Sequence, residues 1–159
     1  MGFLLDTTYI LPFFGIPVKI DNLEKILKKI LRNNLIEVSI SSCSLIEAKW
    51  KAIRLYTKEG QPDYLERANK ALLAFGKGSY FSVHNSWSIP NASYWADVLL
   101  KAGHKDYMDC WIAGTAKVLN LSFVTEDQPL VDTINKIPEW DDETIFSFED
   151  LVEYKKLKE

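Results

Sequence analysis

The sequence predicts an α/β fold built on a parallel sheet. Short apolar runs alternate along the chain with longer segments in which apolar residues recur every three or four positions, and this alternation is typical of linked strand–helix units. The chain has 159 residues, of which 47% are hydrophobic and 26% are charged. These values suit one globular domain with its own core, so we expect residues 1–159 to form a single domain.

In the first half of the chain, each expected strand is an apolar or β-branched run, and each expected helix has apolar residues at helical spacing. Asp21 is a suitable N-cap for the first helix, and the serines around the end of the second strand can cap the next one. In chain order we expect a strand at 2–5, a turn or short helix from 6, a helix at 23–31, a strand at 35–40, and helices at 45–56 and 63–75.

The second half of the chain continues the alternation. Asn120 and Pro138 are expected to end the two helices that precede them. In chain order we expect a strand at 80–83, an irregular segment at 85–91, helices at 93–101 and 106–119, a strand at 122–125, a helix at 129–137, a strand at 144–147, and a charged helix from 149.

Four acidic residues lie where these strands end or where the next helices begin: Asp6, Glu47, Asp109 and Asp127. The carboxyl ends of parallel strands meet at one edge of a sheet, so we expect these side chains in one crevice. At about 4 Å and an effective dielectric of about 20, each pair of like charges costs on the order of 4 kcal/mol. Bound protons or a divalent cation would relieve that cost. The sequence therefore predicts a Mg²⁺ or Mn²⁺ site that hydrolyses phosphodiesters.

The segments that carry these acids also form a family pattern. They are Leu4-Leu5-Asp6-Thr7-Thr8, Ser44-Leu45-Ile46-Glu47, Asp109-Cys110-Trp111-Ile112-Ala113-Gly114-Thr115-Ala116 and Phe123-Val124-Thr125-Glu126-Asp127. In this order, from residue 4 to residue 127, the chain resembles the PIN-domain nucleases, among them the VapC toxins of bacterial and archaeal toxin–antitoxin pairs. The resemblance implies a three-layer α/β/α sandwich with a central parallel sheet and an acidic pocket that cleaves RNA.

The resemblance also implies roles for individual residues. Asp6, Glu47 and Asp109 would hold the main Mg²⁺ or Mn²⁺ ion, and Asp127 would hold a second ion or a metal-bound water. All four acids are therefore expected to be both metal ligands and catalytic residues. Thr8 would lie near the metal, and Thr125 would orient the acids. A metal-activated water would attack the phosphodiester.

For the residues near the acids, the sequence supports less specific expectations. Asp106 lies one helical turn before Asp109, and we expect it to cap that helix and to influence the site indirectly. Glu126 is expected to be solvated. Phe13 and Phe14 are expected in the core or in an interface, with an exposed patch for a partner as the alternative. His84 and His104 are far apart in the sequence and lack a convincing serine or cysteine nucleophile context, so surface or loop positions are expected for both. A set of basic residues either grips phosphates or forms a solvated helix face: Lys49, Lys51 and Arg54.

The remaining properties concern location and partners. No apolar run reaches the ~18 residues that span a bilayer, the N-terminus lacks the features of a signal peptide, and Cys43 and Cys110 lack metal-type spacing. We therefore expect a cytoplasmic protein without membrane contact. The resemblance implies an RNA substrate, an antitoxin protein as partner if the chain is a toxin, and a homodimer. The competing interpretation is a PIN-like module that binds protein or RNA with little turnover.

Overall fold

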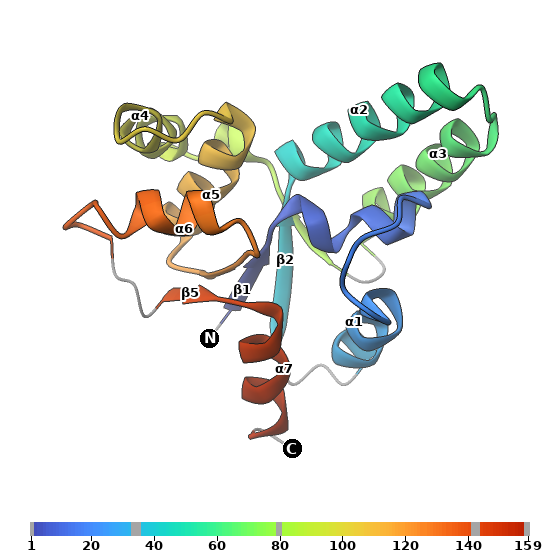
Figure 1. Cartoon of the computed structure of the whole chain (residues 1–159). Helices are drawn as coiled ribbons and strands as arrows, with labels where there is room; N and C mark the ends of the chain where they lie inside the picture. Colours follow the sequence, from blue (N-terminus) through green and yellow to red (C-terminus); the bar gives the residue numbers. More distant parts are fainter. Residues whose placement is uncertain (1, 33–35, 79–80, 141–143, 158–159) are drawn as a thin grey trace.

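A parallel sheet runs through the middle of the molecule (Figure 1). The computed structural model describes residues 2–32, 36–78, 81–140 and 144–157. Within them the strands are β1 (Gly2–Leu5), β2 (Glu37–Ser41), β3 (Ser82–His84), β4 (Ser122–Val124) and β5 (Ile145–Phe146). Their order is β3-β2-β1-β4-β5, and every neighbouring pair is parallel. The predicted parallel sheet is thus confirmed, and β1 lies at its centre.

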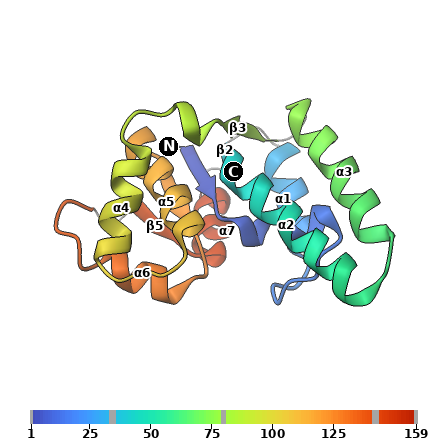
Figure 2. The same ribbon diagram turned by 90° about the horizontal axis from the view of Figure 1, so that it is seen from above.

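Helices cover both faces of this sheet. Along the described chain they are α1 (Leu23–Arg32), α2 (Ser42–Glu59), α3 (Asp63–Gly76), α4 (Ala92–Lys101), α5 (Tyr107–Leu119), α6 (Gln128–Ile134) and α7 (Phe148–Lys156). Short 3-10 helices are η1 (Thr7–Tyr9), η2 (Leu11–Phe14) and η3 (Ser86–Ser88). Figure 2 shows α4, α5 and α6 gathered on one side of β1 and α1, α2 and α3 on the other.

The core confirms the expected three-layer α/β/α arrangement. Successive side chains of a strand point to opposite faces, and β1 follows this rule. Phe3 and Leu5 pack in the hydrophobic cluster that includes residues of α1, α2, α3 and α7. Leu4 and Phe123 pack in the second cluster, with residues of α4, α5 and α6. Each sheet face therefore has its own core.

Polar caps turn the chain from strands into helices at one edge of the sheet. The Ser41 side chain accepts a hydrogen bond from the Cys43 amide at 3.0 Å where β2 leads into α2. Asp127 caps α6 in the same way after β4. Because such caps satisfy amides that have no partner within the helix, the helices begin close to the strand ends, and the residues of their first turns face the same edge.

Some boundaries differ from those expected. Asn22, with a φ of 55°, directly precedes α1, so Asp21, the expected cap, does not adjoin the helix. The helix expected to reach residue 137 ends at Ile134. The amides of Lys136 and Ile137 donate to carbonyls three residues back instead of continuing the α-helix. The expected starts of two strands, Leu35 and Tyr80, lie outside the described residues.

Phe13 and Phe14 lie in the core, as the first of the two interpretations expected, and the alternative of an exposed patch is wrong. Phe14 is fully buried, and the Phe13 ring packs edge-on against Phe75 and Phe81. Both rings belong to the core between η2 and α3. Cys43 and Cys110 are buried free thiols. Among the helices of the described residues, none combines the length and the apolar character needed to cross a membrane.

Candidate functional site

The four predicted acids lie together. One pocket at the carboxyl edge of the central strands is lined by Asp6, Thr7, Thr8, Ile46, Glu47, Trp50, Lys51, Arg54, Asp106, Met108, Asp109 and Asp127. Asp6 directly follows β1, Glu47 lies in the early turns of α2, and Asp109 lies in the first turn of α5. Segments far apart in the sequence thus place carboxylates around one space, as the strand-end argument predicted.

Asp6 is the most deeply buried of these acids, with 4% of its surface exposed. Its Oδ1 accepts a hydrogen bond from the Thr7 amide at 2.6 Å, and its Oδ2 accepts one from the Thr125 hydroxyl at 2.8 Å. Burial raises the pKa of Asp6 to about 6, the charge of Glu47 adds to this, and the two hydrogen bonds oppose it. The two hydrogen bonds therefore fix the orientation of the carboxylate, but they do not offset the cost of burying its charge.

Glu47 is held by two contacts. Its Oε2 accepts a hydrogen bond from the Thr7 hydroxyl at 2.6 Å, and its Oε1 lies 2.5 Å from Lys51 Nζ, one helical turn away. Thr7 therefore connects two acids, because its amide donates to Asp6 and its hydroxyl donates to Glu47. Thr8 was the residue expected near the metal, and no role was expected for Thr7. Thr8 also lines the pocket.

Asp109 is surrounded by the charges of the other acids. Its side chain is 17% exposed. Burial, followed by the charges of Asp6, Glu47, Asp106 and Asp127 in that order, raises its pKa to about 8. The four neighbouring acids all make the charged form of Asp109 less favourable. A cation bound at this place would therefore be stabilised.

Asp127 and Asp106 serve as helix caps beside the pocket. Asp127 Oδ1 accepts a hydrogen bond from the Leu130 amide at 3.1 Å, and the Asp127 amide donates to the Thr125 hydroxyl at 3.1 Å. Thr125 therefore contacts both Asp6 and Asp127, and this is the geometry of a residue that orients acids. Asp106 accepts a hydrogen bond from the Met108 amide at 2.9 Å and caps α5, as expected.

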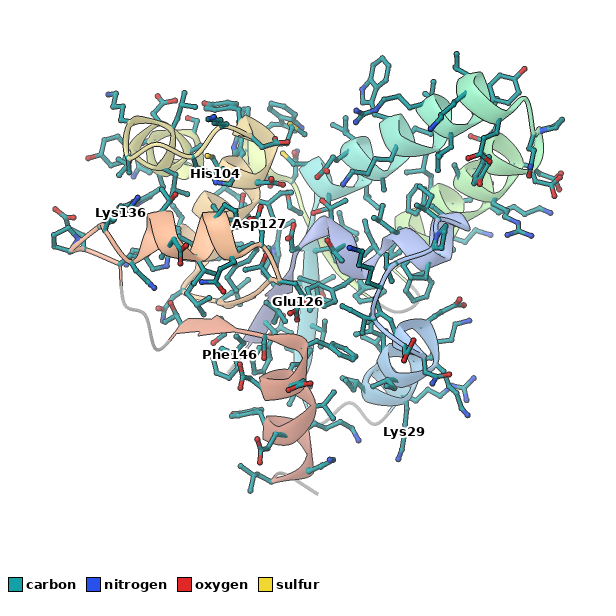
Figure 3. All side chains as sticks on the ribbon, viewed as in Figure 1. Lys29, His104, Glu126, Asp127, Lys136 and Phe146 are labelled. Atoms are coloured by element: carbon teal, nitrogen blue, oxygen red, sulfur yellow. The ribbon has the colours of Figure 1, made fainter. Side chains whose placement is uncertain are left out.

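His104 differs from its expected surface position. It does lie in the loop between α4 and α5, but it is buried, with 8% of its surface exposed. Its Nε2 is 3.6 Å from Asp109 Oδ2 and has no hydrogen-bond partner. In Figure 3 the labelled His104 and Asp127 lie in the same part of the molecule, near α4, α5 and α6. A single loop histidine gives no periodic signal, so the sequence could not reveal its burial.

Glu126 is exposed, as expected, but it also makes structural hydrogen bonds. Its carboxylate is on an exposed residue, yet Oε1 accepts hydrogen bonds from the Tyr9 hydroxyl at 2.9 Å and from the Phe148 amide at 2.7 Å. Glu126 thereby connects η1 to the start of α7, next to the pocket but outside its lining. Its role in the structure is to hold these segments together.

The basic residues of α2 divide into two groups. Lys51 and Arg54 line the pocket, whereas Lys49 donates a hydrogen bond to Asn69 Oδ1 at 2.7 Å on the exposed α2–α3 surface. Trp50 also lines the pocket and is 58% exposed. One wall of the pocket thus offers positive charge and an accessible aromatic ring.

The donor set fits a divalent cation. Four carboxylates supply hard oxygen atoms of the kind that Mg²⁺ and Mn²⁺ bind. Burial is the main cause of the raised pKa values of Asp6 and Asp109, and the charges of the neighbouring acids act in the same direction. A bound cation would provide the missing charge.

Comparison with known proteins agrees with the fold. The family model described as PIN domain matches residues 3–133. The structure of PAE2754 from Pyrobaculum aerophilum is similar, with 17% identity, 99% of this chain and 98% of that chain covered, and a TM-score of 0.62.

Two complexes also contain similar chains. VapBC2 from Rickettsia felis, bound to a DNA fragment from its promoter, matches with 17% identity over 92% of this chain and 97% of that chain and a TM-score of 0.59. VapBC-1 from nontypeable Haemophilus influenzae matches with 22% identity over 91% of this chain and 99% of that chain and a TM-score of 0.57. A search of curated protein sequences gives no match.

The similarity to these solved structures is one of fold. The family model covers most of the chain, and the matched residues include all four segments that carry the acids. By sequence and by architecture, the chain belongs to the PIN domain family.

Proposed function

We propose that this protein is a Mg²⁺- or Mn²⁺-dependent endoribonuclease, with residues 1–159 as one nuclease domain. The observation that carries the proposal is the position of Asp109, whose carboxyl group is surrounded by the charges of Asp6, Glu47 and Asp127 in a single pocket. Membership of the PIN domain family supports a nuclease, and carboxylates at this density suit phosphodiester hydrolysis assisted by a metal ion.

Each acid has a proposed role in this reaction. Asp6, Glu47 and Asp109 would hold the ion, and Asp127 would support a second ion or a water molecule. A bound divalent cation lowers the pKa of water and neutralises charge on the attacked phosphate. Thr7 and Thr125 keep Asp6 in one orientation through hydrogen bonds to its two oxygens. Thr8 would contribute its hydroxyl group near the ion.

The α2 wall is the proposed substrate contact. The Arg54 guanidinium can bind a phosphate oxygen beside the acids. The Trp50 ring is accessible at the pocket, and stacking of a base on an aromatic ring contributes about 1–3 kcal/mol. Lys51 is engaged by Glu47, so Arg54 is the basic residue of this wall that we propose for phosphate binding. Bases that are free to stack favour single-stranded RNA as substrate.

A toxin role and a protein partner follow from the relatives. The similar VapBC structures are complexes, and we propose that this chain likewise pairs with an antitoxin protein that covers the acidic pocket. A homodimer and a cytoplasmic location complete the proposal. They belong with the toxin role and do not affect the chemistry of the pocket.

Cleavage of labelled single-stranded RNA with Mn²⁺, Mg²⁺ or EDTA tests the proposal. Wild type should cut in either metal and not in EDTA, and Asp6→Asn and Asp109→Asn should each abolish cutting while remaining folded. Asp63→Asn is the matched control, because Asp63 is an exposed acid at the start of α3 outside the pocket. Trp50→Ala should raise KM more than it lowers kcat.

Other outcomes of the same experiment would favour a binding module or a different hydrolase. Absence of cutting on several RNAs, together with RNA binding that survives in EDTA, would favour a binding module over an enzyme. Hydrolysis of a generic phosphomonoester such as p-nitrophenyl phosphate, without cutting of RNA, would indicate a small-molecule phosphohydrolase. Cutting that continues in EDTA would contradict the metal requirement.

A further inference from the structure

His104 is a buried imidazole with an unused nitrogen. Its side chain is 7% exposed, and Nε2 has no hydrogen-bond partner. A buried polar atom without a partner costs about 1–3 kcal/mol, so such an atom calls for an explanation. The backbone of this loop is tied to α4, since Gly103 has a φ of 112° and the His104 amide donates to the Leu99 carbonyl at 3.2 Å.

The unused nitrogen faces the acids. Nε2 lies 3.6 Å from Asp109 Oδ2, which is too long for a hydrogen bond. His104, Asp109 and Asp127 each offer one ligand atom, and these three atoms lie within 4.8 Å of one another. Metal–ligand bonds of about 2.0–2.2 Å allow two ligands of one ion to be up to about 4.4 Å apart. The separation of Nε2 from Oδ2 is therefore one that a shared ion can span.

We propose that His104 is a nitrogen ligand in a metal site formed with Asp109 and Asp127, and that this site selects a divalent transition-metal ion over Mg²⁺. Imidazole is a common ligand of first-row transition ions, whereas Mg²⁺ takes oxygen ligands almost exclusively. An all-carboxylate pocket would not discriminate in this way. The proposal rests on the proposed function, because it refines the identity of an ion in the same pocket.

The chain has two histidines, and the second one supplies a matched control. His84 ends β3, its Nε2 also lacks a hydrogen-bond partner, and it does not line the acidic pocket. Substitution of His84 thus removes an imidazole of the same kind without touching the three proposed ligands. Replacement by Gln keeps a side chain of similar size and removes the imidazole nitrogen.

Pulsed electron paramagnetic resonance of bound Mn²⁺ tests the assignment directly, because modulation by ¹⁴N reports a nitrogen ligand. The protein is stripped with EDTA, dialysed and loaded with one equivalent of Mn²⁺. Wild type and His84→Gln should show the nitrogen modulation, and His104→Gln should lose it. Calorimetric titration should show Mn²⁺ affinity falling about 10-fold or more in His104→Gln, with Mg²⁺ affinity unchanged within about threefold.

The outcomes distinguish this proposal from the proposed function. Bound Mn²⁺ without nitrogen modulation in wild type would overturn the role of His104 and leave the carboxylate metal site standing. Absence of Mn²⁺ and Mg²⁺ binding would overturn the proposed function itself. If His104→Gln does not fold, His84→Gln provides the test. In this variant His104 is the one histidine left in the sequence. Labelling histidine with ¹⁵N must then change the nitrogen modulation of the bound Mn²⁺ signal.

Discussion

The Thr125 hydroxyl contacts Asp6, which follows β1, and the backbone of Asp127, which follows β4. It donates to Asp6 Oδ2 at 2.8 Å and accepts from the Asp127 amide at 3.1 Å. A hydroxyl has one proton to give, and here the proton is committed to Asp6. Thr125 therefore fixes which carboxylate lone pairs of Asp6 remain available to a ligand.

Thr125→Val removes this hydroxyl while keeping the shape of the side chain. We expect the Mn²⁺ affinity measured by calorimetry, and the rate of RNA cleavage, to fall about 10- to 100-fold, as for other groups that orient metal ligands. Thr133→Val is the control, because the buried Thr133 donates to the Pro129 carbonyl within α6. It should reduce stability without reducing metal affinity. Unchanged affinity in Thr125→Val would show that the contact does not orient Asp6.

The raised pKa values predict how stability depends on pH in the absence of metal. Asp109 rises from 3.8 to about 8 and Asp6 from 3.8 to about 6 in the folded protein. Between pH about 4 and about 8 the folded state therefore binds more protons than the unfolded chain, so the free energy of unfolding falls as the pH rises.

Asp109→Asn should flatten this dependence. In EDTA we expect the variant to have a Tm several degrees above wild type at pH 8 and a smaller difference at pH 5, given about 2–4 °C per kcal/mol for a chain of this size. Calorimetric scans between pH 5 and pH 9 provide the measurement, with Asp63→Asn as a control whose slope should match wild type. Coincident slopes for wild type and Asp109→Asn would contradict the raised pKa.

At the scale of elements, the contact between α4 and α5 determines where His104 and Asp109 lie. Gly114 is the point of close approach: a Cβ added there would lie 2.5 Å from the Ala92 carbonyl oxygen and 3.1 Å from the Ala96 nitrogen. Both are backbone atoms and cannot move aside independently. The absence of a side chain at this position is therefore what allows the two helices to pack so closely.

Gly114→Ala should consequently destabilise the protein, although alanine favours a helix by about 1 kcal/mol over glycine. Overpacking costs about 1–3 kcal/mol, and movement of α4 would also displace the loop that carries His104. Gly76→Ala is the control, since Gly76 ends α3 and a Cβ there meets nothing within 4 Å. Urea unfolding should show a lower midpoint for the first variant and an equal or higher one for the second. The reverse order would contradict the steric argument.

The elements were predictable where local signals were strong. The strand at Gly2–Leu5 and the helix at Asp63–Gly76 follow from apolar patterning and match the structure closely. The end of α6 was not predictable from Pro138, because proline limits how far a helix can extend but does not set where the tertiary contacts end it. The surroundings of Phe13 and Phe14 depended on α3, which lies far along the sequence.

At the scale of the whole molecule, the pocket unites residues from β1, α2, α5 and the β4–α6 connection. A ligand that binds this arrangement binds only the folded chain, so it must stabilise the entire fold. Mn²⁺ at about 100 times its Kd should add about 2.7 kcal/mol, which raises the Tm by several degrees. Thermal scans of the EDTA-stripped protein should show this increase in wild type and Asp63→Asn but not in Asp109→Asn. An equal increase in all three would place the ion elsewhere.

The gathering of the four acids was predictable at this scale, because parallel strands bring their carboxyl ends to one edge. Two features of the pocket were not. The Thr7–Glu47 hydrogen bond joins residues 40 positions apart, and the burial of His104 depends on how α4 and α5 pack. Patterning reports which face of an element is apolar, but it carries no information about pairwise contacts between polar side chains.

The order of the acids along the chain has a consequence for synthesis. Asp6 emerges first, yet the β1–β4 pairing and Asp127 require residues 122–127. A ribosome must therefore synthesise residues 122–127 before the pocket can close. On the proposed function, a nascent chain that lacks these residues cannot cut the transcript that encodes it, and translation itself delays the onset of activity.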